Sequence, residues 1–302
     1  MRPHRPALLV ALLALLLLVA AGCGGGSKSA KSKGTVVLGT KNFPEEFILG
    51  RLYKQALEAK GFNVVYKENI GSTELIDTAL TSGRIDMYPE YTGVIVQDVF
   101  GHRLSAKTAE ATYRLAKKLE ETRGFTLLDR TPFSDTDAVA VLKSTAAKDH
   151  LRSLGDLKHV PGLRLGGLPE FRTRNTGLVG LRQNYGLTDV DFVPLAGISP
   201  YVALDSHKVD AAAVFSTDPP LGKNSKYVVL ADPVHQFGFQ NAAPVVSQKL
   251  VDKLGSDFAN TLNAVSAKLT QNAIVAMNRA VIVDKQKPAA VAHTFLQANQ
   301  LD

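Results

Sequence analysis

The sequence predicts an α/β fold in two lobes with a ligand cleft between them. Short β-rich runs alternate with helical patterns, which is typical of sheets with mainly parallel strands that are covered by helices. A second set of the same kind follows the first, and residues 35–302 are enough for about two domains of ordinary size. We therefore expect one sheet in each lobe.

The first set of elements begins with a strand at residues 36–39. Pro44 then begins a helix, because proline suits the first helical turn, and apolar side chains recur at helical spacing until Gly61. Further elements expected in this set are strands at 63–66, 85–91 and 125–128 and helices at 73–80 and 107–121.

The second set follows a polar segment at residues 134–137. The elements expected in it are strands at 138–142, 163–166, 191–193, 211–215 and 227–230 and helices at 175–185 and 200–206. A strand at 243–246 is expected to return to the first half, and the chain then turns helical from about residue 248 to 297.

This order predicts two connections between the lobes, near residues 132–137 and 237–241. Two such connections make a hinge with a cleft beside it, and ligands in open α/β sheets bind off the carboxyl ends of the strands. The predicted boundaries are residues 35–134 with 241–302 for lobe 1, and residues 135–240, including the hinge strands, for lobe 2.

The first 22 residues resemble a secretory signal. Arg2 and Arg5 precede an apolar run of about 15 residues, which is shorter than the ~20 needed to span a bilayer as a helix. Cys23, the only cysteine, follows small residues and looks like a bacterial lipoprotein processing site, where this cysteine is lipidated. The alternative is a plain signal peptide with an incidental cysteine.

Residues 23–34 are small, flexible and basic, so we expect a solvated tether. Two arginines and three lysines of the chain's net charge of +7 lie in the first 34 residues, which leaves +2 for residues 35–302. The basic balance therefore gives no reason to expect nucleic-acid binding. The expected location is the outer face of the cytoplasmic membrane, held by the lipid anchor.

Motifs for catalysis, cofactors and metals are missing from the sequence. Lys223 lacks the preceding glycine of a phosphate loop, no G-x-S-x-G segment occurs, and the seven histidines are scattered. Lipidation of Cys23 would leave no thiol nucleophile. We expect a protein that is not an enzyme, with no cofactor and no metal.

Two segments stand out as candidate ligand-binding sequences. At residues 39–46 a strand runs into a helix start, where backbone N–H groups and Lys41 form a positive corner suited to a carboxylate. At residues 86–93 the sequence DMYPEYTG places two tyrosines and two acids around a proline. A solvated Lys41 and structural tyrosines are the alternatives.

These segments resemble the substrate-binding lipoproteins of osmoprotectant ABC importers, which capture glycine betaine, choline, carnitine and similar compounds. TKNF at residues 40–43, FSTD at 215–218 and NAAPVV at 241–246 support the likeness, which runs from residue 35 to the C-terminus. The resemblance implies a two-lobed periplasmic-binding fold of type II. It also implies a membrane permease with a separate ATPase as the partner of a monomeric binding protein.

A quaternary ammonium group has no N–H to donate, so it is bound by aromatic faces and negative charge, and a ligand carboxylate needs Lys or Arg. Position by position, the resemblance implies that ligand-binding residues are Lys41, Tyr91, Asp135, Asp137, Arg174, Phe215 and Phe239. Secondary candidates are Asn42, Tyr88, Arg172, Tyr201, Thr217 and Gln240. Arg172 is the alternative to Arg174, and Gln240 the alternative to Phe239.

Two departures from the family's pattern alter the expected ligand. Val94 replaces a threonine and loses a hydroxyl, and Asp137 replaces an aromatic residue of the cage. We therefore predict a more polar or more cationic ligand than glycine betaine. Alternatives are a binding protein for a polyamine or an amino acid, and a ligand-sensing lipoprotein that feeds no transporter.

Overall fold

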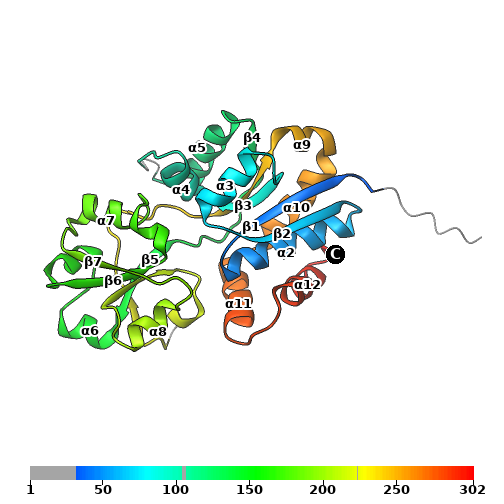
Figure 1. Ribbon diagram of the computed structural model, residues 1–302. Coiled ribbons are helices and arrows are strands. Elements are labelled where there is room, and N and C mark those ends of the chain that lie inside the picture. Colours follow the sequence, from blue (N-terminus) through cyan, green and yellow to red (C-terminus); the bar gives the residue numbers. More distant parts are fainter. Residues whose placement is uncertain (1–31, 104–106, 223) are drawn as a thin grey trace, which may run out of the picture. The chain divides into compact units, whose positions relative to one another are not determined.

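Two five-stranded sheets organise the described residues, which are 32–103, 107–222 and 224–302 of the computed structural model. The predicted signal sequence, Cys23 and the tether up to residue 31 lie outside the described residues. We call the part built on the first sheet lobe 1 and the part built on the second sheet lobe 2 (Figure 1).

The first sheet has the strand order β2-β1-β3-β10-β4. Its strands are β1 (Thr35–Lys41), β2 (Asn63–Gly71), β3 (Met87–Tyr91), β4 (Phe125–Leu127) and β10 (Ala242–Ser247). The helices of this lobe are α2 (Pro44–Ala59), α3 (Thr73–Thr81), α4 (Thr92–Val94), α5 (Ala109–Glu121), α9 (Gln248–Leu254), α10 (Ser256–Lys268), α11 (Gln271–Ile282) and α12 (Pro288–Ala298), with a π-helical turn, η1 (Ile95–Val99), after α4. The predicted return of the chain at residues 243–246 is confirmed by β10.

The second sheet repeats this arrangement with the order β7-β6-β8-β5-β9. Its strands are β5 (Asp137–Leu142), β6 (Leu163–Gly167), β7 (Val190–Pro194), β8 (Ala211–Phe215) and β9 (Tyr227–Val229). The helices of lobe 2 are α6 (Lys143–Lys148), α7 (Leu178–Tyr185) and α8 (Pro200–Asp205), with short turns η2 (Leu154–His159), η3 (Pro169–Arg172) and η4 (Pro219–Leu221).

The prediction of mainly parallel strands is wrong for one side of each sheet. β1 pairs in parallel with β2 and β3, whereas β10 is antiparallel to both β3 and β4. Likewise β6 is parallel to β7 and β8, whereas β5 is antiparallel to β8 and β9. The reason is that β5 and β10 each enter their sheet from the other lobe, so they start at the edge where their neighbours end.

The two connections between the lobes lie side by side. Ser134 and Asn241 form an isolated antiparallel bridge, and the Asp135 N–H donates to the Gln240 carbonyl at 2.9 Å. The register then pairs Asp137 with Phe215 on one side and Ala242 with Tyr91 on the other. The carboxyl ends of β3 and β8 therefore meet at the hinge.

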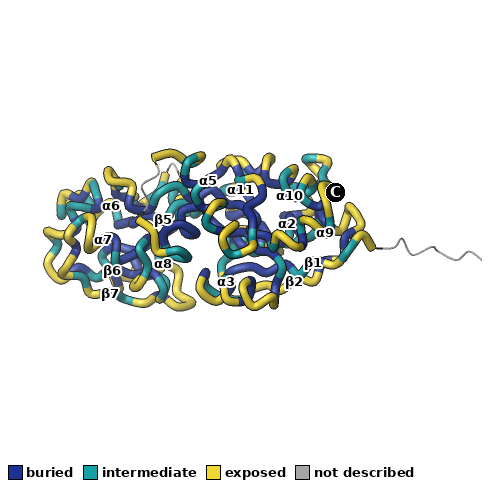
Figure 2. Tube along the Cα trace, turned by 90° about the horizontal axis from the view of Figure 1, so that it is seen from above, coloured by how far each residue is buried: buried dark blue, intermediate teal, exposed yellow. Residues whose placement is uncertain are grey.

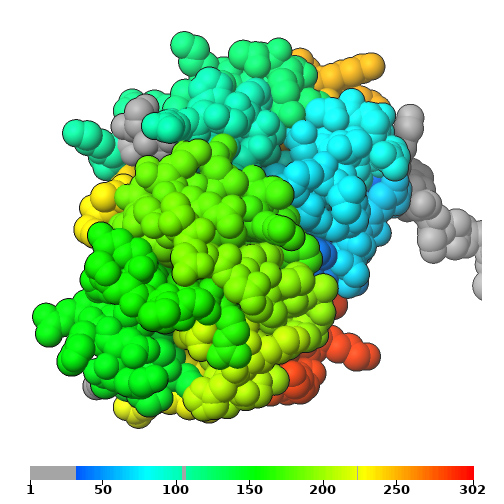
Figure 3. Space-filling model, turned by 60° about the vertical axis from the view of Figure 1, so that its left-hand side comes forward, coloured from blue at the N-terminus to red at the C-terminus, as the bar shows by residue number. Residues whose placement is uncertain are grey.

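Each lobe has its own hydrophobic core around its sheet. Figure 2 shows that buried residues concentrate along the strands and on the helix faces that cover them. On one face, the green surface of lobe 2 adjoins cyan and red surfaces of lobe 1 (Figure 3). Within the described residues, no helix is both long and apolar enough to cross a membrane.

Candidate functional site

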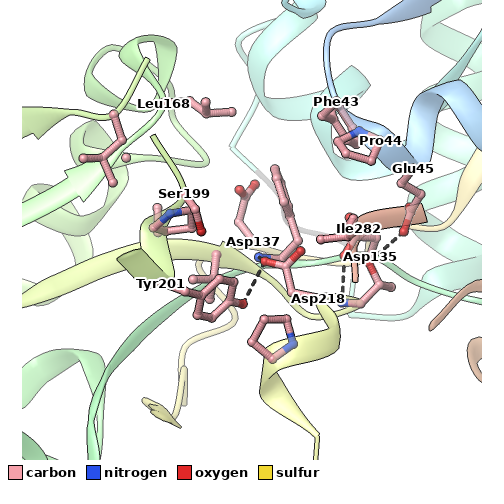
Figure 4. Close-up of a pocket in the computed structure, with 18 of the residues that line it drawn as sticks. Phe43, Pro44, Glu45, Asp135, Asp137, Leu168, Ser199, Tyr201, Asp218 and Ile282 are labelled. Atoms are coloured by element: carbon pink, nitrogen blue, oxygen red, sulfur yellow. Dashed lines mark hydrogen bonds between the residues drawn. The ribbon is translucent and has the colours of Figure 1, made fainter. Parts of the chain in front are cut away.

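A cavity of about 360 Å³ lies between the two lobes. Lobe 1 lines it from the start of α2 and from α11, and lobe 2 lines it from segments that follow β6, β7 and β8. Figure 4 shows Leu168, Ser199 and Tyr201 on one side, and Glu45 and Ile282 on the other. The cavity therefore lies where the strand order predicts the cleft.

The charges that line this cavity are mostly negative. Its carboxyl side chains are Glu45, Asp135, Asp137, Glu170 and Asp218, against the single guanidinium of Arg174. Among the described residues, no group of three or more His, Cys, Asp and Glu side chains could hold a metal ion. The acid excess favours an organic cation as the occupant.

Glu45 accepts three hydrogen bonds, one of which joins the two lobes. Pro44 begins α2 and places Glu45 in its first turn, where negative charge suits the positive end of the helix dipole. Tyr91 Oη donates to Glu45 Oε1 at 2.8 Å, and Asn278 Nδ2 donates to Oε2 at 2.7 Å. Thr217 of lobe 2 places its Oγ1 2.7 Å from the same Oε2.

The Thr217 hydroxyl also lies 2.8 Å from Asp135 Oδ1. A hydroxyl carries one hydrogen and can donate to only one of these two carboxyl groups. The arrangement is satisfied when the Glu45 and Asp135 pair holds one proton. Burial raises the pKa of Glu45, and burial together with the nearby Glu45 charge raises the pKa of Asp135 well above its usual range.

Two further cavity acids have raised pKa values. Burial raises the pKa of Asp137 to about 7, although the charge of Arg174 acts in the opposite direction. Burial also raises the pKa of Asp218, whose Oδ2 accepts hydrogen bonds from the Phe215 N–H at 3.1 Å and from Tyr201 Oη at 2.9 Å. Asp137 therefore titrates in the neutral range.

Aromatic rings from both lobes meet beside the cavity. Phe43 of lobe 1 stacks on Phe215 of lobe 2, with ring centroids 5.4 Å apart and planes 17° from parallel. Phe43 also stacks on Tyr91 at 6.2 Å. Phe43 and Phe215 line the main cavity, whereas Tyr91 lines a smaller adjoining cavity of about 30 Å³.

Lys41 occupies one face of Tyr91. Its Nζ lies 4.4 Å from the Tyr91 ring centroid and 5.4 Å from that of Phe43, which is a cation–π geometry. The same ammonium donates to Glu90 and lies 4.0 Å from Glu46, and all three of these charged side chains are buried. In this conformation Lys41 is held by the protein's own acids.

Arg174 is also paired within the protein. Its Nε and Nη2 donate to the two carboxyl oxygens of Glu74, on α3 of lobe 1, at 2.9 and 3.1 Å. Burial raises the pKa of Glu74, but the hydrogen bonds and charge of Arg174 outweigh this effect and lower it to about 2. Arg174 lines both cavities, so its remaining N–H groups stay close to the cleft.

A second set of contacts holds the lobes together beside this ion pair. Helix α7 begins at Leu178, later than the predicted residue 175, and the turn before it faces lobe 1. Asn175 Nδ2 donates to the Gln97 carbonyl at 2.8 Å, and the Thr176 hydroxyl donates to Asp98. Thr176 is buried and Asp98 is half-buried, so this hydrogen bond is partly shielded from water.

Replacing Thr176 with valine is expected to shift the lobes toward a more separated arrangement. The change removes the hydroxyl donor of the half-buried Asp98 carboxyl, which keeps the Thr176 N–H, at a cost of about 1–2 kcal/mol to the state in which the lobes touch. Small-angle X-ray scattering should report a larger radius of gyration than for the unsubstituted chain. Thr173→Val is the matched control, because the Thr173 hydroxyl bonds only to Glu170 within lobe 2.

The structure brings some predicted site residues to the cleft and places others elsewhere. Asp135, Asp137, Arg174 and Phe215 line both cavities; Thr217 and Tyr201 line the larger one; Lys41, Asn42, Tyr91 and Gln240 line the smaller one. Phe239 is not brought to either, and lines a separate cavity with its ring stacked on His235 at 6.2 Å. Tyr88 lies in the lobe 1 core and Arg172 is exposed.

Gln240 has a structural role at the hinge. Its Nε2 donates to the Phe237 carbonyl at 2.8 Å, and its Oε1 accepts from the Val94 N–H at 2.9 Å. This side chain therefore ties the second connection to lobe 1.

Several cavity residues were absent from the predicted site, and four of them make contacts described above. Phe43 and Glu45 lie within a segment that the sequence singles out, and Asp218 ends the FSTD segment, so their neighbours gave a signal. No signal in the sequence pointed to Asn278, because this residue lies on α11, more than two hundred residues after Glu45. Asn278 is buried, and its Oδ1 has no hydrogen-bond partner among the described residues.

Comparison with known proteins shows which protein family this chain matches. Residues 34–298 match the substrate-binding domain of ABC-type glycine betaine transport systems. The chain belongs to this family. A glycine-betaine-binding protein of Pseudomonas aeruginosa is 33% identical over 88% of each chain.

Solved structures agree with this substrate-binding family. Unliganded YehZ from Escherichia coli is 28% identical with a TM-score of 0.62, over 89% of this chain and 99% of that one. A glycine betaine/carnitine/choline ABC transporter structure is 24% identical with a TM-score of 0.68, over 88% of this chain and 99% of that one. The type II periplasmic-binding fold implied by the resemblance is thereby confirmed.

Proposed function

We propose that this protein is the extracytoplasmic solute-binding component of an ABC importer and that it captures a quaternary ammonium osmoprotectant between its lobes. The observation that carries the proposal is the cavity in which Phe43 and Phe215 meet carboxyl groups from both lobes. Aromatic faces and negative charge are what a cation without N–H groups requires. Membership of the substrate-binding family supports the same function.

The proposed ligand-binding residues are predicted residues that also line the cavity, together with Phe43 and Glu45, which the cavity adds. The cationic head lies against Phe43 and Phe215, near Glu45, Asp135 and Asp137. Arg174, released from Glu74 or using its remaining N–H groups, is the proposed partner of a ligand carboxylate. Tyr91 acts on the site indirectly, because its hydroxyl holds Glu45 and its ring faces Lys41.

The wider organisation remains as the sequence predicts it. Cys23 carries the lipid, residues 23–34 form the tether, and the monomer lies on the outer face of the cytoplasmic membrane. Lobe 1 comprises residues 35–134 and 241–302, and lobe 2 residues 135–240. Exposed rims of both lobes deliver the ligand to a permease with a separate ATPase, and the protein itself performs no catalysis.

Calorimetric titration of the purified full-length chain tests the proposal. The ligands are choline, glycine betaine, carnitine, proline betaine, putrescine and arginine, with the neutral carbon isostere of choline as the control. We expect at least one trimethylammonium compound to bind and the neutral isostere to bind far more weakly. Failure of every trimethylammonium compound would contradict the osmoprotectant proposal, and failure of all six ligands would favour a sensing role.

Phe215→Ala is expected to raise the Kd of the bound trimethylammonium compound by about threefold to thirtyfold, because it removes one aromatic face. Phe239→Ala is the matched control, since the structure places Phe239 outside the two cleft cavities. Equal effects of the two substitutions on Kd would argue that the ligand does not lie against Phe215.

The acid excess in the cavity favours a second candidate, a binding protein for another small cation such as a polyamine. Binding of putrescine or arginine alone would keep the importer role and discard the osmoprotectant. Whichever ligand binds, Asp137→Ala tests the predicted preference for a more cationic ligand, because it removes one carboxyl group from the cavity. Tight binding of glycine betaine together with an unchanged affinity in this variant would contradict that preference.

A further inference from the structure

The lobe 2 side of the cavity is an apolar surface. Leu168 and Phe171 follow β6, Leu195, Ile198 and Pro200 follow β7, and Ala213 lies on β8. We call these six residues the apolar wall. Because β6 is parallel to both β7 and β8, the carboxyl ends of these strands meet and bring the wall together.

Most polar groups on this side are engaged in hydrogen bonds or lie at its edge, and Ser199 also lines it. The Tyr201 hydroxyl donates to Asp218, and Glu170 lies where the main cavity adjoins the smaller one. The acid groups that face a cationic head are Glu45 on lobe 1 and Asp135 and Asp137, where the first connection enters lobe 2. Figure 4 shows Leu168 and Glu45 on opposite sides of the cavity. The cavity therefore has a charged end and an apolar end.

The cavity is large for a ligand as small as glycine betaine. A cavity of about 150 Å³ is enough to hold benzene. Glycine betaine, with about eight non-hydrogen atoms, is only slightly larger than benzene, whereas this cavity of about 360 Å³ has more than twice that volume. A ligand of this size would fill the charged end and leave the apolar wall uncovered.

The volume does not reflect widely separated lobes. Glu45 contacts Thr217, Glu74 contacts Arg174, and Asp98 contacts Thr176, each pair joining lobe 1 to lobe 2. These contacts lie beside or around the cavity and are already made. The space between Glu45 and the apolar wall is thus present with the lobes in contact.

We propose that the ligand is an organic cation whose apolar body is larger than that of glycine betaine and lies against the apolar wall. This inference rests on the proposed function and adds a ligand class to it. The cationic head occupies the charged end, and an aromatic ring or short alkyl chain occupies the apolar end. Ile198 is the residue best placed to test it, because its side chain lines the cavity and is 38% exposed.

A homologous series of cations tests the charged end and the apolar end of the cavity separately. The probes are tetramethylammonium, butyltrimethylammonium, hexyltrimethylammonium and benzyltrimethylammonium, titrated calorimetrically into the full-length chain. Each methylene buried against the wall is expected to tighten Kd by about threefold to fourfold. The heat-capacity change of binding should become more negative along the series, since more apolar surface is buried.

Ile198→Ser should reduce the gain in affinity from tetramethylammonium to hexyltrimethylammonium by at least about fivefold, while tetramethylammonium binds as before. Val202→Ser is the matched control, because Val202 is a 59% exposed apolar residue of the same lobe that does not line the cavity. Thermal denaturation of both variants checks that they are folded.

Different outcomes overturn different claims. If all four cations bind with similar Kd, or if affinity falls as the chain lengthens, the apolar wall packs against protein rather than ligand, and this inference is overturned while the proposed function stands. If none of these cations and none of the natural compounds binds, the proposed function fails and the inference fails with it. If Ile198→Ser and Val202→Ser reduce the gain in affinity along the series equally, the proposed contact between the ligand and the apolar wall is also contradicted.

Discussion

Replacing Glu45 with alanine is expected to be the most damaging single substitution at the cleft. It removes the acceptor for Tyr91, Asn278 and Thr217, which come from β3, α11 and lobe 2. Thr217 can turn to Asp135, but the Tyr91 hydroxyl and one amide hydrogen of Asn278 lose their partner. Each unsatisfied buried group costs about 1–3 kcal/mol, so we expect unfolding free energy to fall by on the order of 3 kcal/mol.

Ligand binding in Glu45→Ala should weaken by on the order of a hundredfold, because the variant loses both a cavity charge and a contact between the lobes. Chemical denaturation and calorimetric titration measure the two effects separately. Glu58→Ala on the same helix is the control, since Glu58 is exposed and pairs only with Lys54 at the surface.

Glu45→Gln separates hydrogen bonding from charge. A glutamine can place its carbonyl oxygen toward Asn278 and Thr217 and its amide toward Tyr91, whose hydroxyl can accept. We expect this variant to remain about as stable as the unsubstituted chain while binding a cation more weakly. Unchanged binding in Glu45→Gln, with loss only in Glu45→Ala, would show that Glu45 supports the cleft and does not attract the ligand.

Replacing Glu46 with glutamine is expected to stabilise the protein at alkaline pH. Burial and the neighbouring Glu90 raise the pKa of Glu46 from 4.5 to about 8, although Lys41 acts in the opposite direction. One buried ammonium cannot neutralise two buried carboxylates, so the protonated form of Glu46 suits the site.

The sign of the pH dependence follows from this shift. Between pH 4.5 and about 8 the folded state holds a proton on Glu46 that the unfolded state has released. This contribution to stability is fully present below the unfolded pKa and is lost as the pH rises through the folded pKa. The loss amounts to on the order of 5 kcal/mol across the window.

Chemical denaturation at several pH values measures this effect. The unfolding free energy of Glu46→Gln should exceed that of the unsubstituted chain increasingly as pH rises, since glutamine has no proton to release. Other buried acids, such as Asp137, remain in both proteins and cancel in the comparison. A difference between the two chains that does not change with pH would contradict the assignment to Glu46. Glu58→Gln should leave the profile unchanged.

Local patterns were enough to predict most elements of the fold. Pro44 and the apolar spacing after it predict α2, and the short β-rich runs correspond to β1–β10. Strand direction was not predictable in the same way. β5 and β10 have the same composition as their neighbours, and their antiparallel pairing follows from where the chain enters each sheet.

The candidate site was predictable only where its residues lie in distinctive segments. Asp135, Asp137, Arg174 and Phe215 were predicted and lie at the cavity. Phe239 and Gln240 could not be told apart, because successive residues of an extended connection point to opposite sides. Gln240 proved to hold the hinge, and Phe239 lies outside the two cleft cavities.

Residue types and their order along this chain determine the α/β class, the two lobes and the family, because these depend on periodicity and short segments. Tertiary structure alone decides which side chains share an environment. Asn278 meets Glu45 because α11 packs on α2, and Lys41 is neutralised by Glu90 because β1 and β3 are neighbours. The apolar wall likewise forms because three separate strands end at one edge. Such contacts join residues far apart in the sequence, and burial then sets their charge.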